Sequence, residues 1–267
     1  MTDQDLCFFP ATLLVQMIRA KQVSPVEVMQ AIINRVERLE PKINAFAYFD
    51  GDRALDRAKV AEAQLARGEA QGALFGLPVT IKDLAVTGDM PTERGSWIEK
   101  GNQPDTDAPF VQRLKMAGAI PLGKTTTSEF GWKGVSQSPL TGITHNPWAH
   151  GLNAGASSAG AGAAAAAGYG PLHQGSDGAG SVRMPAHFCG IFGLKPSFGR
   201  VPNWPVPSND QTSHIGPMTR TVTDSALMME TISGPHPWDH YSLESPPSPY
   251  VRELDGASVK GLRVAWS

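Results

Sequence analysis

The chain has 267 residues, of which 41% are hydrophobic and 18% are charged, and its formal net charge is -2. This balance excludes a disordered chain, and the near-neutral charge gives no electrostatic signature of nucleic-acid or anionic-membrane binding. No apolar run reaches membrane-spanning length, and the acidic N-terminus does not resemble a secretory signal. The two cysteines, Cys7 and Cys189, are too few for a disulfide framework and lack metal-ligand spacing. We therefore expect a cytoplasmic protein.

The first seventy residues carry the patterns of helices. Ser24-Pro25-Val26-Glu27 is a capping box with proline at the first helical position. Apolar residues follow it at helical spacing as far as Pro41, which is expected to end that helix. A second stripe of smaller apolar residues covers 53–66. We expect an N-terminal helical segment over residues 1–70.

The pattern changes from residue 76 onward. Residues 76–81 form a short apolar, partly β-branched run that predicts a buried strand, with Lys82 and Asp83 at its end. Apolar residues among charges predict a helix over 107–117, and a strand is expected over 119–122.

Loop signals dominate the second half of the chain. The stretch 153–170 is rich in glycine and alanine, and 175–180 is a glycine-rich loop that a helical turn follows. Residues 201–217 and 234–249 are rich in proline and serine and are expected to be surface loops. A short helix is predicted from Thr223 through Met229.

The last residues, 261–266, have the pattern of an opening strand with no partner, which predicts that the chain is an N-terminal portion of a longer fold. Alternating strands and helices predict an α/β fold with a mixed β-sheet core flanked by helices. We divide the chain into the helical segment 1–70, a core over 71–235, and a proline-rich loop with the start of a further strand over 236–267.

Residues Gly118 to Thr125 fit the phosphate-binding pattern G-x-x-x-x-G-K-[ST] letter for letter. That chemistry requires a strand before the first glycine and a helix after the lysine. Here a predicted helix precedes Gly118, the predicted strand lies inside the pattern, and Pro121 lacks a backbone N–H. We interpret the pattern as a helix–turn–strand connection.

Lys82 stands at the end of an apolar strand, and two interpretations are open. Its stem could pack on apolar neighbours while the ammonium group reaches water. Alternatively the whole side chain is buried, in which case desolvation disfavours its charged form and makes the amine a base.

Two segments of small residues carry serines that could act with Lys82. They are Asn153-Ala154-Gly155-Ala156-Ser157-Ser158-Ala159-Gly160 and Gly175-Ser176-Asp177-Gly178-Ala179-Gly180-Ser181-Val182-Arg183. Small residues let successive backbone N–H groups converge on one point, so Ser181 has the setting of an acyl-transfer nucleophile. Either segment taken alone is better explained as a flexible linker or a tight turn.

No histidine has the setting of the base in a Ser-His-Asp triad. His173 and His187 flank the second serine segment and are interpreted as structural or substrate-facing. The sequence therefore offers Lys82 as the base, relayed through a second serine.

These motifs resemble those of the amidase signature family of amide hydrolases, over about residues 10–235. The resemblance is densest in Gly76-Leu77-Pro78-Val79-Thr80-Ile81-Lys82-Asp83, Gly123-Lys124-Thr125, Thr144-His145-Asn146-Pro147-Trp148, both serine segments, and Gly193-Leu194-Lys195-Pro196-Ser197-Phe198-Gly199-Arg200.

The resemblance implies an amidase that cleaves a small carboxylic amide into acid and ammonia or amine. Ser181 would attack the carbonyl, Ser157, held by a cis peptide, would relay the proton, and a neutral Lys82 would accept it. The backbone N–H groups of Gly178, Ala179, Gly180 and Ser181 would hold the oxyanion. No cofactor and no metal are implied, the partner is a small-molecule amide, and a homodimer is a possible assembly.

The chain departs from the family pattern around Ser157, where Ala156 and Ala159 replace glycines, and strain in this turn is therefore expected. Two alternatives stay open. One is an amidotransferase A-type subunit that releases ammonia from glutamine, and the other is a non-catalytic remnant of the family.

Overall fold

The computed structural model describes residues 2–207 and 210–265. Its α-helices are α1 (Asp3–Phe8), α2 (Ala11–Arg19), α3 (Pro25–Ile43), α4 (Gly51–Ala66), α5 (Pro109–Met116), α6 (Ala159–Ala167), α7 (Arg183–Cys189), α8 (Val222–Ile232) and α9 (Tyr250–Leu254). Its strands are β1 (Phe46–Phe49), β2 (Pro78–Lys82), β3 (Ile120–Thr125), β4 (Gln137–Ser138), β5 (Gly142–Ile143), β6 (His145–Asn146), β7 (Ala149–Asn153), β8 (Leu172–Asp177), β9 (Phe192–Gly193) and β10 (His214–Thr219). Short 3-10 turns cover Trp97–Glu99, Glu129–Gly131 and Asp210–Thr212.

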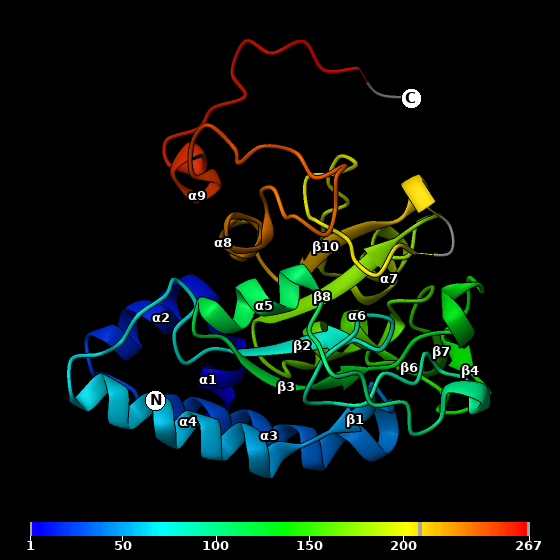
Figure 1. The fold of residues 1–267 in the computed structure, drawn as a ribbon. Helices are drawn as coiled ribbons and strands as arrows, with labels where there is room; N and C mark the ends of the chain where they lie inside the picture. Colours follow the sequence, from blue (N-terminus) through cyan, green and yellow to red (C-terminus); the bar gives the residue numbers. More distant parts are fainter. Residues whose placement is uncertain (1, 208–209, 266–267) are drawn as a thin grey trace.

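Six strands form one mixed sheet in the order β1-β3-β2-β8-β10-β9. The three central strands, β3, β2 and β8, are parallel, while β1, β10 and β9 each pair antiparallel with their neighbours. Helices lie on both sides of this sheet, with α5 and α8 in front of it and α6 behind it in the view of Figure 1. The prediction of a mixed β-sheet core flanked by helices is confirmed.

Helix α6 is buried on nearly every side, since only Ala166 among its residues is partly exposed. Its glycines allow this close packing. An added Cβ at Gly160 would lie 2.4 Å from the backbone nitrogen of Thr126 and 2.5 Å from the carbonyl oxygen of Ala45. Helix α6 therefore packs directly against the backbone that follows β3. This contact fixes the position of the N-terminal end of α6 and of the serines that precede it.

Two expectations for the N-terminal segment need correction. Pro41 does not end its helix, because α3 continues to Ile43 and ends at Asn44, whose left-handed φ of 55° reverses the chain. The missing N–H of a proline in the last turn removes only one hydrogen bond, which the packing of α3 tolerates. The segment is also not purely helical, since Phe46–Phe49 forms the edge strand β1 against β3.

Three expectations for the second half also need correction. The supposed glycine-rich loop starts later, because β8 continues through Asp177 by pairing with β10. Residues 214–217, expected in a surface loop over 201–217, belong instead to β10 (His214–Thr219), which is mostly buried. Residues 261–265 form no strand and are exposed, and Trp266 lies outside the described residues. Whether such a segment forms a strand depends on hydrogen bonds to a neighbouring strand, and amino-acid composition does not reveal that pairing.

Within residues 2–207 and 210–265, no helix is both long and apolar enough to cross a bilayer.

Candidate active site

Lys82 and Asp177 lie at the same edge of the sheet. Lys82 is the last residue of β2 and Asp177 is the last residue of β8, and these two strands are parallel neighbours. Carboxyl ends of parallel strands meet at one edge, where α/β proteins commonly place their ligand sites. The two serine segments reach this same edge, one ahead of α6 and one after β8.

Lys82 is completely buried, so the interpretation that its ammonium group reaches water is wrong. Its Nζ lies 2.7 Å from Ser157 Oγ and 2.8 Å from Ser158 Oγ. It also lies 3.0 Å from Ser176 Oγ and 3.4 Å from the Ser176 carbonyl oxygen. The Gln174 side chain accepts a hydrogen bond from the Lys82 backbone N–H at 2.9 Å. The terminal amine thus faces hydroxyl and carbonyl oxygens, with no carboxylate of the described residues in hydrogen-bond contact.

Burial lowers the pKa of Lys82 from 10.5 to about 7, because the low-dielectric interior disfavours the charged form. The charge of Asp177 acts in the opposite direction but does not outweigh burial. A large fraction of this lysine is therefore neutral at physiological pH, and a neutral amine can accept a proton.

Ser157 is buried to 3% exposure and reaches Lys82 without the expected cis peptide. Among the described residues, the cis peptide is Trp204–Pro205, so the bonds flanking Ser157 are trans. A cis bond outside X–Pro costs about 2.5–4 kcal/mol, and the trans chain already brings the hydroxyl to the amine. Ala156 and Ala159 are absent from the residues with positive φ, so the expected strain at these alanines is not found.

Sequence reasoning assigned no role to Ser158 and Ser176, yet both contact Lys82. Ser158 Oγ donates to the Ser176 carbonyl at 3.1 Å and accepts from the Ser176 N–H at 3.2 Å. This pair ties the N-terminal end of α6 to β8 behind the lysine. Two adjacent serines facing a strand serine are a weak sequence signal, because only the tertiary arrangement shows which hydroxyl faces the amine.

The Asp177 carboxylate organises the loop that carries Ser181. It accepts hydrogen bonds from the backbone N–H groups of Gly180 at 2.7 Å, Val182 at 3.1 Å and Arg183 at 3.3 Å. The Arg183 guanidinium adds two contacts at 2.9 and 3.0 Å. Burial alone would raise the pKa of Asp177, but these hydrogen bonds outweigh it and lower the pKa to about 2.

Gly180 was expected to offer its N–H to an oxyanion, but Asp177 already occupies that donor. The backbone N–H groups of Gly178, Ala179 and Ser181 make no hydrogen bond with any described residue. They are the predicted donors that remain available to a ligand.

Ser157 and Ser181 line one cavity of about 390 Å³. The Ser181 hydroxyl makes no hydrogen bond within residues 2–207 and 210–265, so the structure brings Lys82 and Ser157 together but leaves Ser181 unpaired. The other lining residues come from strand β8, helix α7 and several connecting segments, and are Leu84, Phe130, Gly131, Trp132, Lys133, Gly134, Ala156, Ser176, Gly178, Ala179, Met184, Thr212 and Ser213.

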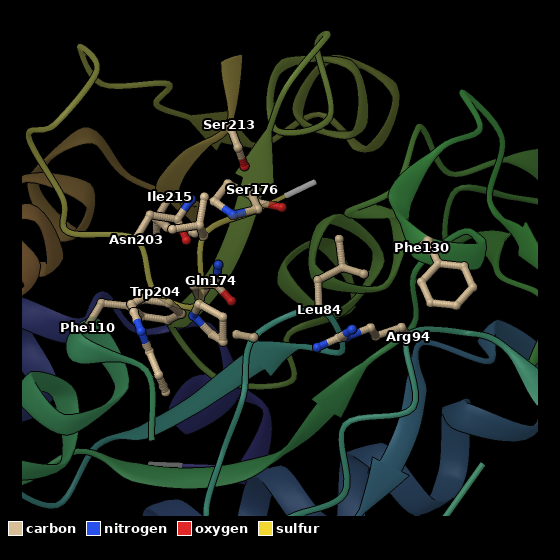
Figure 2. A pocket seen from close by; sticks show the side chains of 14 residues that line it. Leu84, Arg94, Phe110, Phe130, Gln174, Ser176, Asn203, Trp204, Ser213 and Ile215 are labelled. Atoms are coloured by element: carbon tan, nitrogen blue, oxygen red, sulfur yellow. The ribbon is translucent and has the colours of Figure 1, made fainter. Parts of the chain in front are cut away.

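A second cavity of about 290 Å³ adjoins the first, and the two share Leu84, Phe130, Ser176 and Ser213 in their walls. Figure 2 shows it from close by, with Gln174 and Ser176 on one side and Arg94 and Leu84 on the other. Its wall is mostly apolar.

Lys124 and Asp83 form a buried pair beside the site. Lys124 Nζ lies 3.7 Å from Asp83 Oδ1 and donates to Thr92 Oγ1 at 2.7 Å and to the Ala85 carbonyl at 2.8 Å. The phosphate-loop pattern is a helix–turn–strand connection, as the sequence predicts, but the strand, expected over 119–122, is β3 (Ile120–Thr125) and includes Lys124. The pair holds the chain between 83 and 95 against the sheet.

His173 is structural. It is completely buried, with Nδ1 2.9 Å from Thr80 Oγ1 and Nε2 3.0 Å from the Gly170 carbonyl. Burial lowers its pKa to about 3. In the described part of the chain, no three His, Cys, Asp or Glu side chains gather as a metal site would require.

Comparison with known proteins agrees with this geometry. A family model described as Amidase matches residues 27–267. The acylamidase of Rhodococcus erythropolis is 44% identical over 276 aligned positions, which cover 100% of this chain and 56% of that protein. The A-type subunit of the glutamyl-tRNA(Gln) amidotransferase of Acidothermus cellulolyticus is 39% identical, over 97% of this chain and 52% of that protein.

Among solved structures, a bacterial aryl acylamidase of the amidase signature enzymes is similar with a TM-score of 0.84 and 31% identity, over 92% of this chain and 52% of that one. The chain spans about half the length of the relatives that it matches. The family model covers far more than half of this chain. The chain belongs to the amidase signature family.

Proposed function

We propose that this chain carries the catalytic centre of an amidase that hydrolyses a carboxylic amide to an acid and ammonia or an amine. The observation that carries the proposal is a fully buried Lys82, with a pKa near 7, 2.7 Å from Ser157 in the wall of a cavity that Ser181 also lines. Such a constellation supplies a base, a relay and a nucleophile without histidine or metal ligands.

In this mechanism Ser181 Oγ attacks the amide carbon and forms a C–O bond. Its proton passes to Ser157 Oγ, whose own proton passes to the neutral Lys82 Nζ. When the tetrahedral intermediate collapses, the C–N bond breaks and the leaving nitrogen takes a proton back through Ser157. Water then attacks the acyl-Ser181 by the same route, which releases the acid and restores the serine.

The oxyanion of the intermediate would be held by the N–H groups of Gly178, Ala179 and Ser181, which have no partner among the described residues. Removal of one such donor typically costs about 3–4 kcal/mol of barrier lowering, so this backbone matters as much as the nucleophile. The Asp177 carboxylate supports the loop by fixing Gly180 and Val182.

A fluorophosphonate probe on the full-length protein tests the proposal. We expect stoichiometric labelling of Ser181, found by peptide mass spectrometry, and no labelling of the Ser181→Ala variant. An unlabelled wild-type protein that hydrolyses no amide in a broad panel would favour a non-catalytic remnant. Labelling without loss of amide hydrolysis in Ser181→Ala would remove Ser181 from the mechanism.

A second candidate is an amidotransferase A-type subunit, which the 39% identity to such a protein favours. It would use the same residues to release ammonia from glutamine for a partner enzyme. The two candidates differ in a simple assay. An amidase hydrolyses amides alone, whereas an amidotransferase component releases ammonia from glutamine faster when its partner and acceptor are present. The homodimer and the cytoplasmic location stay predictions of the sequence.

A further inference from the structure

The cavity beside the catalytic one has a single charged group in its wall. Of the described residues that line it, Arg94 alone is charged. Most of the others are apolar, among them Phe110 and Ile215, and four are neutral and polar: Gln174, Ser176, Asn203 and Ser213. Figure 2 shows the Arg94 guanidinium beneath Leu84, pointing toward the centre of the cavity. A partly buried cation attracts an anion more strongly than the same cation in bulk water, because the effective dielectric near a protein surface is lower than that of water.

The backbone at Arg94 is held in a conformation that few side chains adopt. Arg94 has φ 53° and Phe130, in the wall of both cavities, has φ 48°. Only four described non-glycine residues have positive φ, so half of them lie at this cavity. Left-handed non-glycine residues cost about 1–3 kcal/mol and concentrate at ligand sites, where neighbouring contacts maintain them.

Those neighbouring contacts tie Arg94 to the catalytic centre. The Arg94 N–H donates to the carbonyl of Asp83 at 3.1 Å, and Asp83 is the residue after the catalytic lysine. The Arg94 carbonyl accepts from the Phe130 N–H at 2.9 Å. These two hydrogen bonds fix the backbone of Arg94, and with it the direction in which its side chain leaves the chain relative to Lys82.

The Arg94 guanidinium has spare donors. Its one ion-pair contact within the described residues is to Glu99 at 3.7 Å, which exceeds hydrogen-bond distance, and its side chain is 32% exposed. A guanidinium carries five N–H donors arranged to bind a carboxylate through two parallel hydrogen bonds. Glu99 does not line the cavity, so a ligand carboxylate can approach the guanidinium from the cavity side.

We propose that Arg94 is a specificity-determining residue that binds a carboxylate on the substrate, and that the preferred substrates are monoamides of dicarboxylic acids. Leu84 and Phe130, which line both cavities, would contact the methylene chain. The amide would lie at Ser181, and the distal carboxylate at Arg94. This inference rests on the amidase function proposed above and names its substrate class.

The test compares matched substrates on the full-length protein. We expect kcat/KM for monoamides of dicarboxylic acids, at the best chain length, to exceed that for neutral aliphatic amides of equal length. In Arg94→Gln this value should fall roughly 10- to 100-fold for the anionic substrate, mainly through KM, as expected for one lost charged hydrogen-bond pair. The neutral substrate should change less than about threefold, which also shows that the variant folds. Arg94→Lys should recover part of the loss because it keeps the charge.

A matched control is Arg67→Gln, which removes the same charge at an exposed pair with Glu69 beyond the end of α4. It should leave both substrates unaffected. Equal losses on anionic and neutral substrates in Arg94→Gln, or no loss on either, would overturn the role of Arg94. A wild-type enzyme that hydrolyses neutral amides with no preference for anionic ones would overturn this inference and leave the amidase proposal intact. If no amide is hydrolysed at all, the amidase proposal fails, and calorimetric binding of the monoamide to wild-type and Arg94→Gln protein then decides the role of Arg94 by itself.

Discussion

Lys82 Nζ lies 2.7 Å from Ser157 Oγ in a place that solvent does not reach. The distance alone would suit a charged lysine that donates to the hydroxyl. Burial lowers the pKa of Lys82 to about 7, and a neutral amine at this distance can accept a proton from the hydroxyl.

The first prediction is that amide hydrolysis follows the deprotonation of Lys82. Below pH 7 the rate should rise about tenfold per pH unit, and above pH 7 it should reach a plateau, because the base is active only when neutral. Lys82→Arg keeps the positive charge and stays protonated, so turnover should fall by about 100-fold or more. The measurement is kcat/KM from pH 5 to 9. A flat profile in the wild type, or normal turnover in Lys82→Arg, would show that Lys82 is not the base.

The second prediction concerns stability. Between the folded pKa of about 7 and the unfolded value of 10.5, the unfolded chain binds more protons at Lys82 than the folded protein does. The free energy of unfolding therefore gains up to about 1.4 kcal/mol per pH unit from this residue as pH rises from 7 to 10. Lys82→Met removes that contribution, so its melting temperature should rise less between pH 7 and 9 than that of the wild type. Ser181→Ala retains Lys82 and should keep the wild-type slope. Identical slopes in all three proteins would contradict a buried, neutral Lys82.

The third prediction compares two contributions of Asp177 to stability: its hydrogen bonds to backbone N–H groups and its ion pair with Arg183. Asp177→Asn replaces an acceptor that serves three backbone N–H groups, and should cost about 3 kcal/mol or more of the free energy of unfolding. Arg183→Ala keeps those three bonds and removes a 55% exposed partner, so it should cost only about 1 kcal/mol. Chemical denaturation measures both. Equal costs would mean that the loop is held by the ion pair and not by the backbone contacts.

Asp177 also makes the stability of the folded protein depend on pH in acid. The folded pKa of Asp177 is about 2, below its unfolded value of 3.8, so its contribution is present above pH 4 and is lost as the pH falls through 2.

Much of this candidate site could be predicted because its residues lie in short segments of unusual composition. A lysine at the end of an apolar strand and a serine after glycines are local patterns, and the buried strand before Lys82 shows as a short apolar run. The capping box at Ser24 is present, with both hydrogen bonds of the motif.

The parts that could not be predicted depend on packing between distant segments. Helix α6 has no polar face, because it is buried all round, and so gives no amphipathic signal. Strand β10 contains Gly216 and Pro217, which composition assigns to loops, and exists because it pairs with β8. The hydrogen bond from the Gly180 N–H to the Asp177 carboxylate forms where Gly180 has a positive φ of 107°. No pattern in the sequence specifies this backbone conformation.

The last prediction concerns Gly155, two residues before Ser157. Its φ is +125°, and an added Cβ would lie 2.4 Å from Cα of Pro185 in α7, the helix that follows Ser181. Because the close contact is with the backbone of Pro185, these atoms cannot move aside at low energetic cost. Gly155→Ala should therefore cost about 2–4 kcal/mol of the free energy of unfolding through strain and overpacking. It should also separate the Ser157 turn from α7, and a displacement of about 1 Å in a reacting group can cost on the order of 100-fold in rate.

The matched control is Ala156→Gly at the next position. Ala156 has no positive φ, and Ser157 already reaches Lys82 with this alanine in place, so added freedom brings no gain. Ala156→Gly should leave turnover unchanged and cost only about 0.4–1 kcal/mol, because glycine makes the unfolded chain more disordered. Melting temperatures and turnover of the two variants beside the wild type give the comparison. Faster turnover in Ala156→Gly would mean that the alanine does strain the relay serine, and wild-type behaviour of Gly155→Ala would mean that the contact with α7 does not position Ser157.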